Sequence, residues 1–146
     1  MGAILRAKIE AGLRKWAQVK CKSAIRKNQD LWKKLEHYIS NTNSTGCGDI
    51  DYYHLYSQIK KYRPKEVLEC GTGVTTLVIA HALLENEIET GISGRVTSME
   101  EHSDWLLMSR KLLPEEYNRF VDFQLSKTVE DTFSLFRGVR YLEIPD

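Results

Sequence analysis

The chain has 146 residues, of which 42% are apolar and 28% are charged, as in an ordinary globular domain. No apolar run approaches the roughly 18 residues of a membrane-spanning helix. Basic residues interrupt the N-terminal segment, unlike a secretory signal peptide, so a cytoplasmic protein is expected. The three cysteines form no C-x-x-C pair and the four histidines form no paired ligand motif. Neither a disulfide framework nor a metal site is therefore predicted.

The net charge of +1 is unevenly distributed along the chain. Residues 1–40 hold ten Lys or Arg and three Asp or Glu, a net charge of +7, whereas the remainder holds eleven and seventeen, a net charge of −6. Such a basic arm can bind nucleic acid or a membrane surface, although a solvated helix face is the simpler interpretation. The arm lacks the interleaved aromatic residues that are typical of single-strand binders.

The first half of the chain is predicted to be helical. Apolar residues recur at helical spacing over residues 3–40, which predicts one long helix, or two with a break near Lys20–Ser23. Residues 41–48 form a polar loop. Either Asp49 or Asp51 suits the N-cap of a further helix that runs to Arg63 and ends before Pro64.

Strands and helices alternate after residue 64. The predicted strands are 65–70, 95–99 and 120–125, the predicted helices are 74–84, 102–113 and 128–136, residues 86–94 form a loop, and residues 139–144 are extended. This order predicts a βαβαβ unit with parallel strands and right-handed crossovers. In the third strand, Val121, Phe123 and Leu125 alternate with polar residues, which indicates an edge strand with one solvated face.

The most informative motif is V-L-E-C-G-T-G-V-T-T at residues 67–76. A G-x-G turn between a strand and a helix lets the backbone approach a ligand closely and offers free N–H groups. A dinucleotide site would need a third glycine where this chain has Thr76. Glu69 would repel a pyrophosphate but attract the sulfonium and ammonium groups of S-adenosylmethionine (SAM), so SAM is the better match.

A second acidic motif follows the second strand, which ends in Glu100-Glu101. An acid at this position can accept hydrogen bonds from both hydroxyls of a ribose. We favour Glu100 for this role, with Glu101 as a solvated neighbour.

Together these stretches resemble the first two motifs of class I SAM-dependent methyltransferases, over about residues 50–135. The resemblance implies that Glu69, Gly71, Thr72 and Gly73 line the methionine end of SAM. It also implies that Glu100 holds the ribose, and that Ser126 or Lys127 lies near the adenine. No catalytic residue can be chosen. A small-molecule or glycan-like acceptor is expected rather than nucleic acid.

The chain departs from that family in its number of strands. The family sheet has seven strands in the order 3-2-1-4-5-7-6, whereas only the first three are predicted here, and residues 139–146 look like the approach to the fourth. We therefore expect an α/β, Rossmann-like fold with a helical arm at 1–48 and an incomplete methyltransferase domain at 49–146. Such a chain would be inactive alone and prone to self-association through the exposed edge of its first strand.

Two other functions stay open. One is a non-catalytic binding module that retains the fold, and the other, less favoured, is an NAD-dependent oxidoreductase.

Several conspicuous side chains are predicted to have structural roles. Cys70 and His81 are expected to be packed, His102 to face solvent, and Trp105 to pack beneath the cofactor site. The tyrosines at 52, 53 and 56 are assigned to a core stripe.

Overall fold

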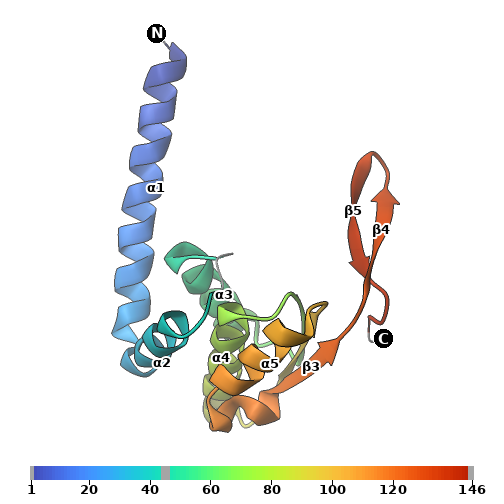
Figure 1. Cartoon of the computed structure of the whole chain (residues 1–146). Helices are drawn as coiled ribbons and strands as arrows, with labels where there is room; N and C mark the ends of the chain where they lie inside the picture. The colour runs from blue at the N-terminus through green and yellow to red at the C-terminus, as the bar shows by residue number, and fades with distance from the viewer. Residues whose placement is uncertain (1, 44–46, 145–146) are drawn as a thin grey trace.

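The computed structural model describes residues 2–43 and 47–144, with the side chains of 2–5 and 7–9 left aside. Three helices come first, and Figure 1 shows α1 extending away from the remaining elements. The elements are α1 (Gly2–Lys27), α2 (Gln29–Ser40), α3 (Asp49–Tyr62), β1 (Glu66–Cys70), α4 (Val74–Thr90), β2 (Arg95–Glu100), α5 (Ser103–Leu112), the 3₁₀ helix η1 (Glu115–Phe120), β3 (Val121–Leu125), β4 (Thr128–Phe133) and β5 (Phe136–Tyr141). The fold is thus mixed α/β.

The central sheet has three parallel strands in the order β1-β2-β3. This confirms the predicted parallel βαβαβ unit and its strand order. Because β3 pairs with β2 alone among the described strands, it is an edge strand, as predicted. Val121 and Phe123 pack against the core and Asp122 is exposed, but Leu125 is 54% exposed and does not continue the apolar face.

The core is built around α4. Residues 76–83 of this helix are all buried, as expected for a helix that is apolar on every side. Helix α3 packs on α4, and α1 packs on α3. Leu31, Leu35 and Tyr38 of α2 belong to the same core cluster, so the C-terminal part of the basic arm is anchored in the α/β unit.

The break in the helical arm lies at Asn28, not near Lys20–Ser23 as expected. The Asn28 side chain caps α2 by accepting a hydrogen bond from the Leu31 N–H at 3.1 Å. An N-cap asparagine leaves helical geometry and satisfies a free N–H of the next helix, so the chain turns there.

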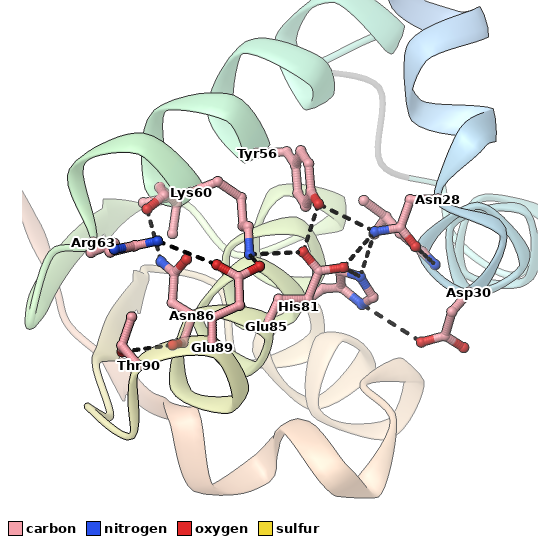
Figure 2. A network of polar contacts seen from close by, with 12 residues as sticks. Asn28, Asp30, Tyr56, Lys60, Arg63, His81, Glu85, Asn86, Glu89 and Thr90 are labelled. Carbon is pink, nitrogen blue, oxygen red and sulfur yellow. Dashed lines mark hydrogen bonds and ion pairs between the residues drawn. The ribbon is translucent and has the colours of Figure 1, made fainter.

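Asn28 also joins a polar network on α4, which Figure 2 shows. Its amide donates to Glu85 at 2.6 Å, and the Tyr56 hydroxyl donates to the same carboxylate at 2.6 Å. His81 is buried as predicted, with ring nitrogens 2.6 Å from the Tyr117 hydroxyl and 3.0 Å from Glu85. Burial alone would raise the pKa of Glu85, but the hydrogen bonds from His81 and Tyr56 outweigh it and lower the pKa to about 2.

Two helix boundaries differ from the predictions. Helix α4 continues to Thr90, through residues 86–90 of the segment 86–94 that was expected to be a loop, and the Asn86 amide donates to the Ile59 carbonyl at 2.9 Å. Gly91 then ends the helix with a φ of 71°. At the start of α3 the N-cap is Gly48, whose N–H donates to Asp51 at 2.9 Å. The predicted loop 41–48 includes residues 44–46, which lie outside the described residues.

The end of the chain forms a hairpin where a short helix was predicted at 128–136. Strand β4 pairs antiparallel with β5, and Ser134, with a φ of 57°, lies in the turn between them. Residues 139–141 thus belong to β5, with Val139 paired to Glu130, whereas the segment 139–146 was expected to be the approach to a fourth strand of the sheet. Figure 1 shows this hairpin projecting from the end of β3.

No helix of the described part of the chain is long and apolar enough to cross a membrane.

Gly94 marks the tightest backbone contact beneath the sheet. A Cβ at this position would lie 2.5 Å from the Pro64 carbonyl oxygen and 2.8 Å from Leu83 Cδ2. We expect Gly94→Ala to lower the free energy of unfolding by about 1–3 kcal/mol, because overpacking forces backbone shifts. Urea titration measures this change. Gly12→Ala is the control, since nothing lies within 4 Å of its added Cβ and it should leave stability equal or higher. Equal stability of Gly94→Ala and wild type would contradict the tight contact.

Candidate functional site

The G-x-G turn lies at the carboxyl ends of β1 and β2. Gly71 has a φ of +93°, a conformation that favours glycine, and its N–H donates to the Met99 carbonyl at 2.8 Å. Gly73 is the N-cap of α4, and its N–H donates to the Thr76 hydroxyl at 3.0 Å. Thr76 stands where a dinucleotide site has its third glycine. Its hydroxyl accepts the Gly73 N–H and so satisfies a backbone donor of the turn.

Glu69 lies beneath this turn and is 9% exposed. One carboxylate oxygen, Oε2, accepts hydrogen bonds from Thr76 and Ser98, both at 2.6 Å. The other, Oε1, is buried and has no hydrogen-bond partner among the described residues. Burial raises the pKa of Glu69, although the neighbouring hydroxyls of Ser98 and Thr76 oppose the shift. A buried carboxylate with one unpaired oxygen favours its protonated form.

Glu100 lies above the turn, at the end of β2, and is 6% exposed. Its Oε2 accepts from the Thr72 N–H at 3.1 Å, and its Oε1 accepts from the N–H groups of Glu101 and His102, each at 3.0 Å. A carboxylate has about four acceptor positions. The fourth is filled by the Thr72 hydroxyl at 3.4 Å, the longest of these contacts. This hydroxyl also accepts from Ser109 at 3.0 Å.

A pocket of about 400 Å³ opens at this end of the sheet. Its walls come from the turn, from the end of β2, from α3 and α5, and from the base of the hairpin. The lining residues are Cys47, Tyr52, Cys70, Gly71, Thr72, Gly73, Val74, Thr75, Glu100, Glu101, His102, Trp105 and Tyr141. Among the described residues, no lysine or arginine lines it. The pocket therefore suits a neutral or cationic ligand better than a polyanion.

A larger hollow, of about 760 Å³, lies against the exposed hairpin at residues 130–132 and 137–139. It is far from the strand carboxyl ends in sequence and includes none of the turn residues, so the smaller pocket is the better candidate site.

The structure brings together four of the six residues predicted to bind a cofactor. Gly71, Thr72, Gly73 and Glu100 line the pocket, whereas Glu69 and Ser126 do not. Glu69 lies beneath the turn. Ser126 is buried after β3, where its N–H donates to the Glu100 carbonyl at 2.9 Å. Its hydroxyl accepts from the Glu143 N–H at 3.3 Å, so this side chain holds the base of the hairpin.

Two structural assignments are wrong. Cys70 is exposed and lines the pocket, rather than being packed, because it is the last residue of β1. Trp105 is 39% exposed and forms part of the pocket wall, rather than packing beneath it. His102 is exposed at the N-cap of α5, as predicted.

Two tyrosines of the pocket were not predicted as site residues. Tyr52 belongs to the core stripe, as expected, but its side chain also lines the pocket, and burial raises its pKa to about 12. Tyr141 comes from β5, and burial together with the nearby Glu100 raises its pKa. No sequence signal pointed to Tyr141, because its placement depends on the hairpin.

Glu101 differs from Glu100 in its surroundings. It is exposed, accepts a short hydrogen bond from the Thr128 hydroxyl, and lies 3.7 Å from His102. Of these two acids, Glu100 is the buried one, and its carboxylate accepts a hydrogen bond from the turn at the Thr72 N–H.

Comparison with models of known protein families gives no match, and neither does comparison with curated proteins. The chemistry of the site therefore has to be argued from its own residues.

The buried carboxylate of Glu69 gives a pH-dependent prediction. Its pKa is raised in the folded state, so the folded protein binds more protons at this group, and the contribution of Glu69 to stability falls as the pH rises above about 4.5. Glu69→Gln keeps an acceptor for Thr76 and Ser98 but cannot ionise. We expect the stability of this variant, relative to wild type, to increase between pH 4.5 and 7, with a slope of at most about 1.4 kcal/mol per pH unit.

Chemical denaturation across this pH range measures the effect. Glu66→Gln, on the same strand but exposed, is the matched control and should show no such trend. Parallel stability curves for Glu69→Gln and wild type would contradict the raised pKa.

Proposed function

We propose that this chain forms the SAM-binding part of a methyltransferase. The observation that carries the proposal is a pocket at the carboxyl ends of β1 and β2 that has two carboxylates and, among the described residues, no lysine or arginine. SAM carries a sulfonium and an ammonium against one carboxylate, so its net charge is positive. Opposite charges about 4 Å apart attract by several kcal/mol at an effective dielectric of about 20.

The same electrostatics disfavour a dinucleotide. A pyrophosphate would face Glu100 and Glu101 without a cation to offset its charge. In addition, Thr76 is committed to Gly73 and Glu69, where a dinucleotide site has a glycine for close packing. An NAD-dependent oxidoreductase is accordingly the less favoured function for this pocket.

The contacts suggest how each residue would hold the ligand. The backbone of Gly71–Gly73 would receive the methionine end, and Glu100 would receive the ribose. Releasing its longest contact, the 3.4 Å hydrogen bond from the Thr72 hydroxyl, would free one acceptor position of Glu100 for a ribose hydroxyl. The Thr72 hydroxyl would keep the hydrogen bond that it accepts from Ser109.

The remaining walls suit a sulfonium. Tyr52, Trp105 and Tyr141 line the pocket, and aromatic faces attract onium groups by about 0.5–2 kcal/mol. SAM supplies a methyl group on a positively charged sulfur. In the transfer, an acceptor lone pair forms a bond to that methyl carbon as the carbon–sulfur bond breaks, leaving a neutral thioether. Glu69 has a supporting role here, because it acts on the turn through Thr76.

A non-catalytic binding module is the second candidate. Among the described strands, β1 pairs only with β2, whereas in open α/β sheets ligands enter beside the central strands where the order reverses. The described residues thus form a pocket at the strand ends, whose proposed ligand is SAM, but no identified acceptor site. Methyl transfer from labelled SAM by this chain would exclude the binding module, whereas SAM retained without turnover is the result expected of a binding module and of an incomplete methyltransferase alike.

The first test of the proposal is ligand selectivity. We expect calorimetry on the full chain to detect binding of SAM and S-adenosylhomocysteine and no binding of NAD. The reason is that only the first two lack a pyrophosphate. Binding of NAD without a SAM signal would contradict the proposal.

The second test compares the adjacent acids. Glu100→Gln loses charge-assisted hydrogen bonds worth about 1.5–3 kcal/mol, so SAM should bind about 10- to 100-fold more weakly. Glu101→Gln is the matched control and should change the affinity less than about threefold, because this side chain is exposed and bonded to Thr128. Thermal unfolding verifies that both variants are folded. Equal losses at the two positions would mean that Glu100 does not hold the ribose.

A further inference from the structure

Helix α1 has an exposed apolar seam that no other described element covers. Leu13, Trp16 and Val19 are 60%, 62% and 64% exposed. Their spacing of three residues places them on neighbouring turns of one helix side. In the sequence, Ile9 and Val19 stand seven residues before and three residues after Trp16, which is the alternating spacing of a helix–helix seam.

This seam is not the side that anchors the helix. Among the described side chains of α1, the buried apolar ones are Cys21 and Ile25. Trp16 and Ile25 are nine residues apart, which is two and a half turns of a helix with about 3.6 residues per turn. They therefore point in opposite directions, and packing within the chain does not account for the exposed seam.

A groove continues the seam toward the body of the protein. It has a volume of about 720 Å³ and is bounded by α1 on one side and by Tyr53 of α3 on the other. Its lining residues are Trp16, Val19, Lys20, Cys21, Ser23, Ala24, Lys27 and Tyr53. An apolar floor with two lysines, set between two helices, suits a rod-shaped amphipathic ligand.

Basic residues lie beside the seam and along it. Lys15 and Lys22 lie to one side, whereas Lys20 and Lys27 follow Trp16 by four and eleven residues and line the groove with it. No carboxylate within the described residues forms an ion pair with Lys15, Lys20 or Lys27. Such flanking charges select the partner in helix pairs. A second copy of α1 would bring lysine against lysine in either orientation, so charge repulsion disfavours self-pairing.

We propose that α1 is a docking helix for an acidic, amphipathic helix of another protein. The partner would lay apolar side chains along Leu13, Trp16 and Val19 and present carboxylates to Lys20 and Lys27. A flat anionic membrane is less suitable, because the apolar residues line a concave groove next to Tyr53. Nucleic acid is less suitable, because phosphates would leave the exposed apolar seam without a partner.

The test uses a designed peptide and the full chain. The probe is a fluorescently labelled helical peptide of about three heptads, with leucine at the core positions and glutamate at the flanking positions. A peptide with lysine in place of each glutamate is its control. Fluorescence anisotropy should show binding of the acidic peptide that weakens with added salt, and binding of the lysine peptide that is at least about tenfold weaker.

Variants of α1 then locate the site. The double variant Lys20→Glu with Lys27→Glu should bind the acidic peptide at least about tenfold more weakly and should gain affinity for the lysine peptide. Arg14→Glu is the matched control, because Arg14 is exposed and lies two residues before Trp16, away from the seam. It should change the affinity less than about twofold. Circular dichroism verifies that the helix content of each variant is unchanged.

Four outcomes would overturn the proposal. The first is equal binding of both peptides, and the second is unchanged binding by the double variant. The third is binding of anionic phosphatidylserine vesicles or duplex DNA in the absence of peptide binding. The fourth is a dimer in sedimentation that Trp16→Glu dissociates, because it would make a second copy the occupant. None of these outcomes bears on SAM binding, which is measured separately.

Discussion

The arrangement of the candidate site depends on two buried carboxylates that hold the G-x-G turn at different points. Glu69 acts on it through Thr76 and Ser98, and Glu100 holds it through the Thr72 N–H. Burying a carboxylate is costly unless hydrogen bonds compensate it. Each of these two has at least two such bonds, and their donors come from β2, the turn, α4 and the start of α5. Moving any one of these elements would expose or orphan a carboxylate, so the strand ends are locked together.

The two carboxylates nevertheless differ in which of their acceptor positions a ligand can use. Every acceptor position of Glu100 is filled, but one of them by a 3.4 Å contact with a hydroxyl that has a second partner in Ser109. That contact can be exchanged for a ligand hydroxyl at small cost. Glu69 is sealed beneath the turn, with one oxygen buried and unpaired among the described residues. Burial favours the protonated form of Glu69, so the negative charge next to the turn is reduced. The negative potential of the pocket then comes mainly from Glu100 and Glu101.

The sequence predicted the parts of this structure that depend on local pattern. The apolar segments around Val67, Val96 and Val121 predicted the three strands, the family resemblance predicted their order, and the G-x-G motif predicted the turn. Local pattern failed where tertiary contacts decide the conformation. Asn86 suggested a loop, yet its amide bonds to the Ile59 carbonyl on another helix and the helix continues. At the hairpin, residues 128–136 were predicted to be helical, and the pairing of β4 with β5 overrides that preference.

The same reasoning explains why the site was only partly predicted. Gly71, Thr72, Gly73 and Glu100 lie within motifs whose spacing is visible in the sequence, and they line the pocket. Tyr141 reaches the pocket only because Leu142 and Glu143 are tied back to Lys127 and Ser126. Such a contact depends on the register of a hairpin that the sequence did not reveal. Ser126 was assigned to the ligand because it follows β3, whereas its hydroxyl is used to hold that hairpin.

The elements that carry the two proposed binding surfaces are both hydrogen-bonded to α4. This helix begins at the turn, where Gly73 and Thr76 cap it, and it carries His81 and Glu85, which hold Asn28 at the junction of α1 and α2. These hydrogen bonds are 2.6–3.0 Å long, and they connect both regions to a helix that is buried over residues 76–83. Coupling between distant sites needs an element with two arrangements that both ligands can bias. A closely packed helix with capped ends provides one arrangement only. Docking on α1 and ligand binding at the turn should therefore be energetically independent, and the charge separation between a basic arm and an acidic pocket lets one chain serve both without mutual interference.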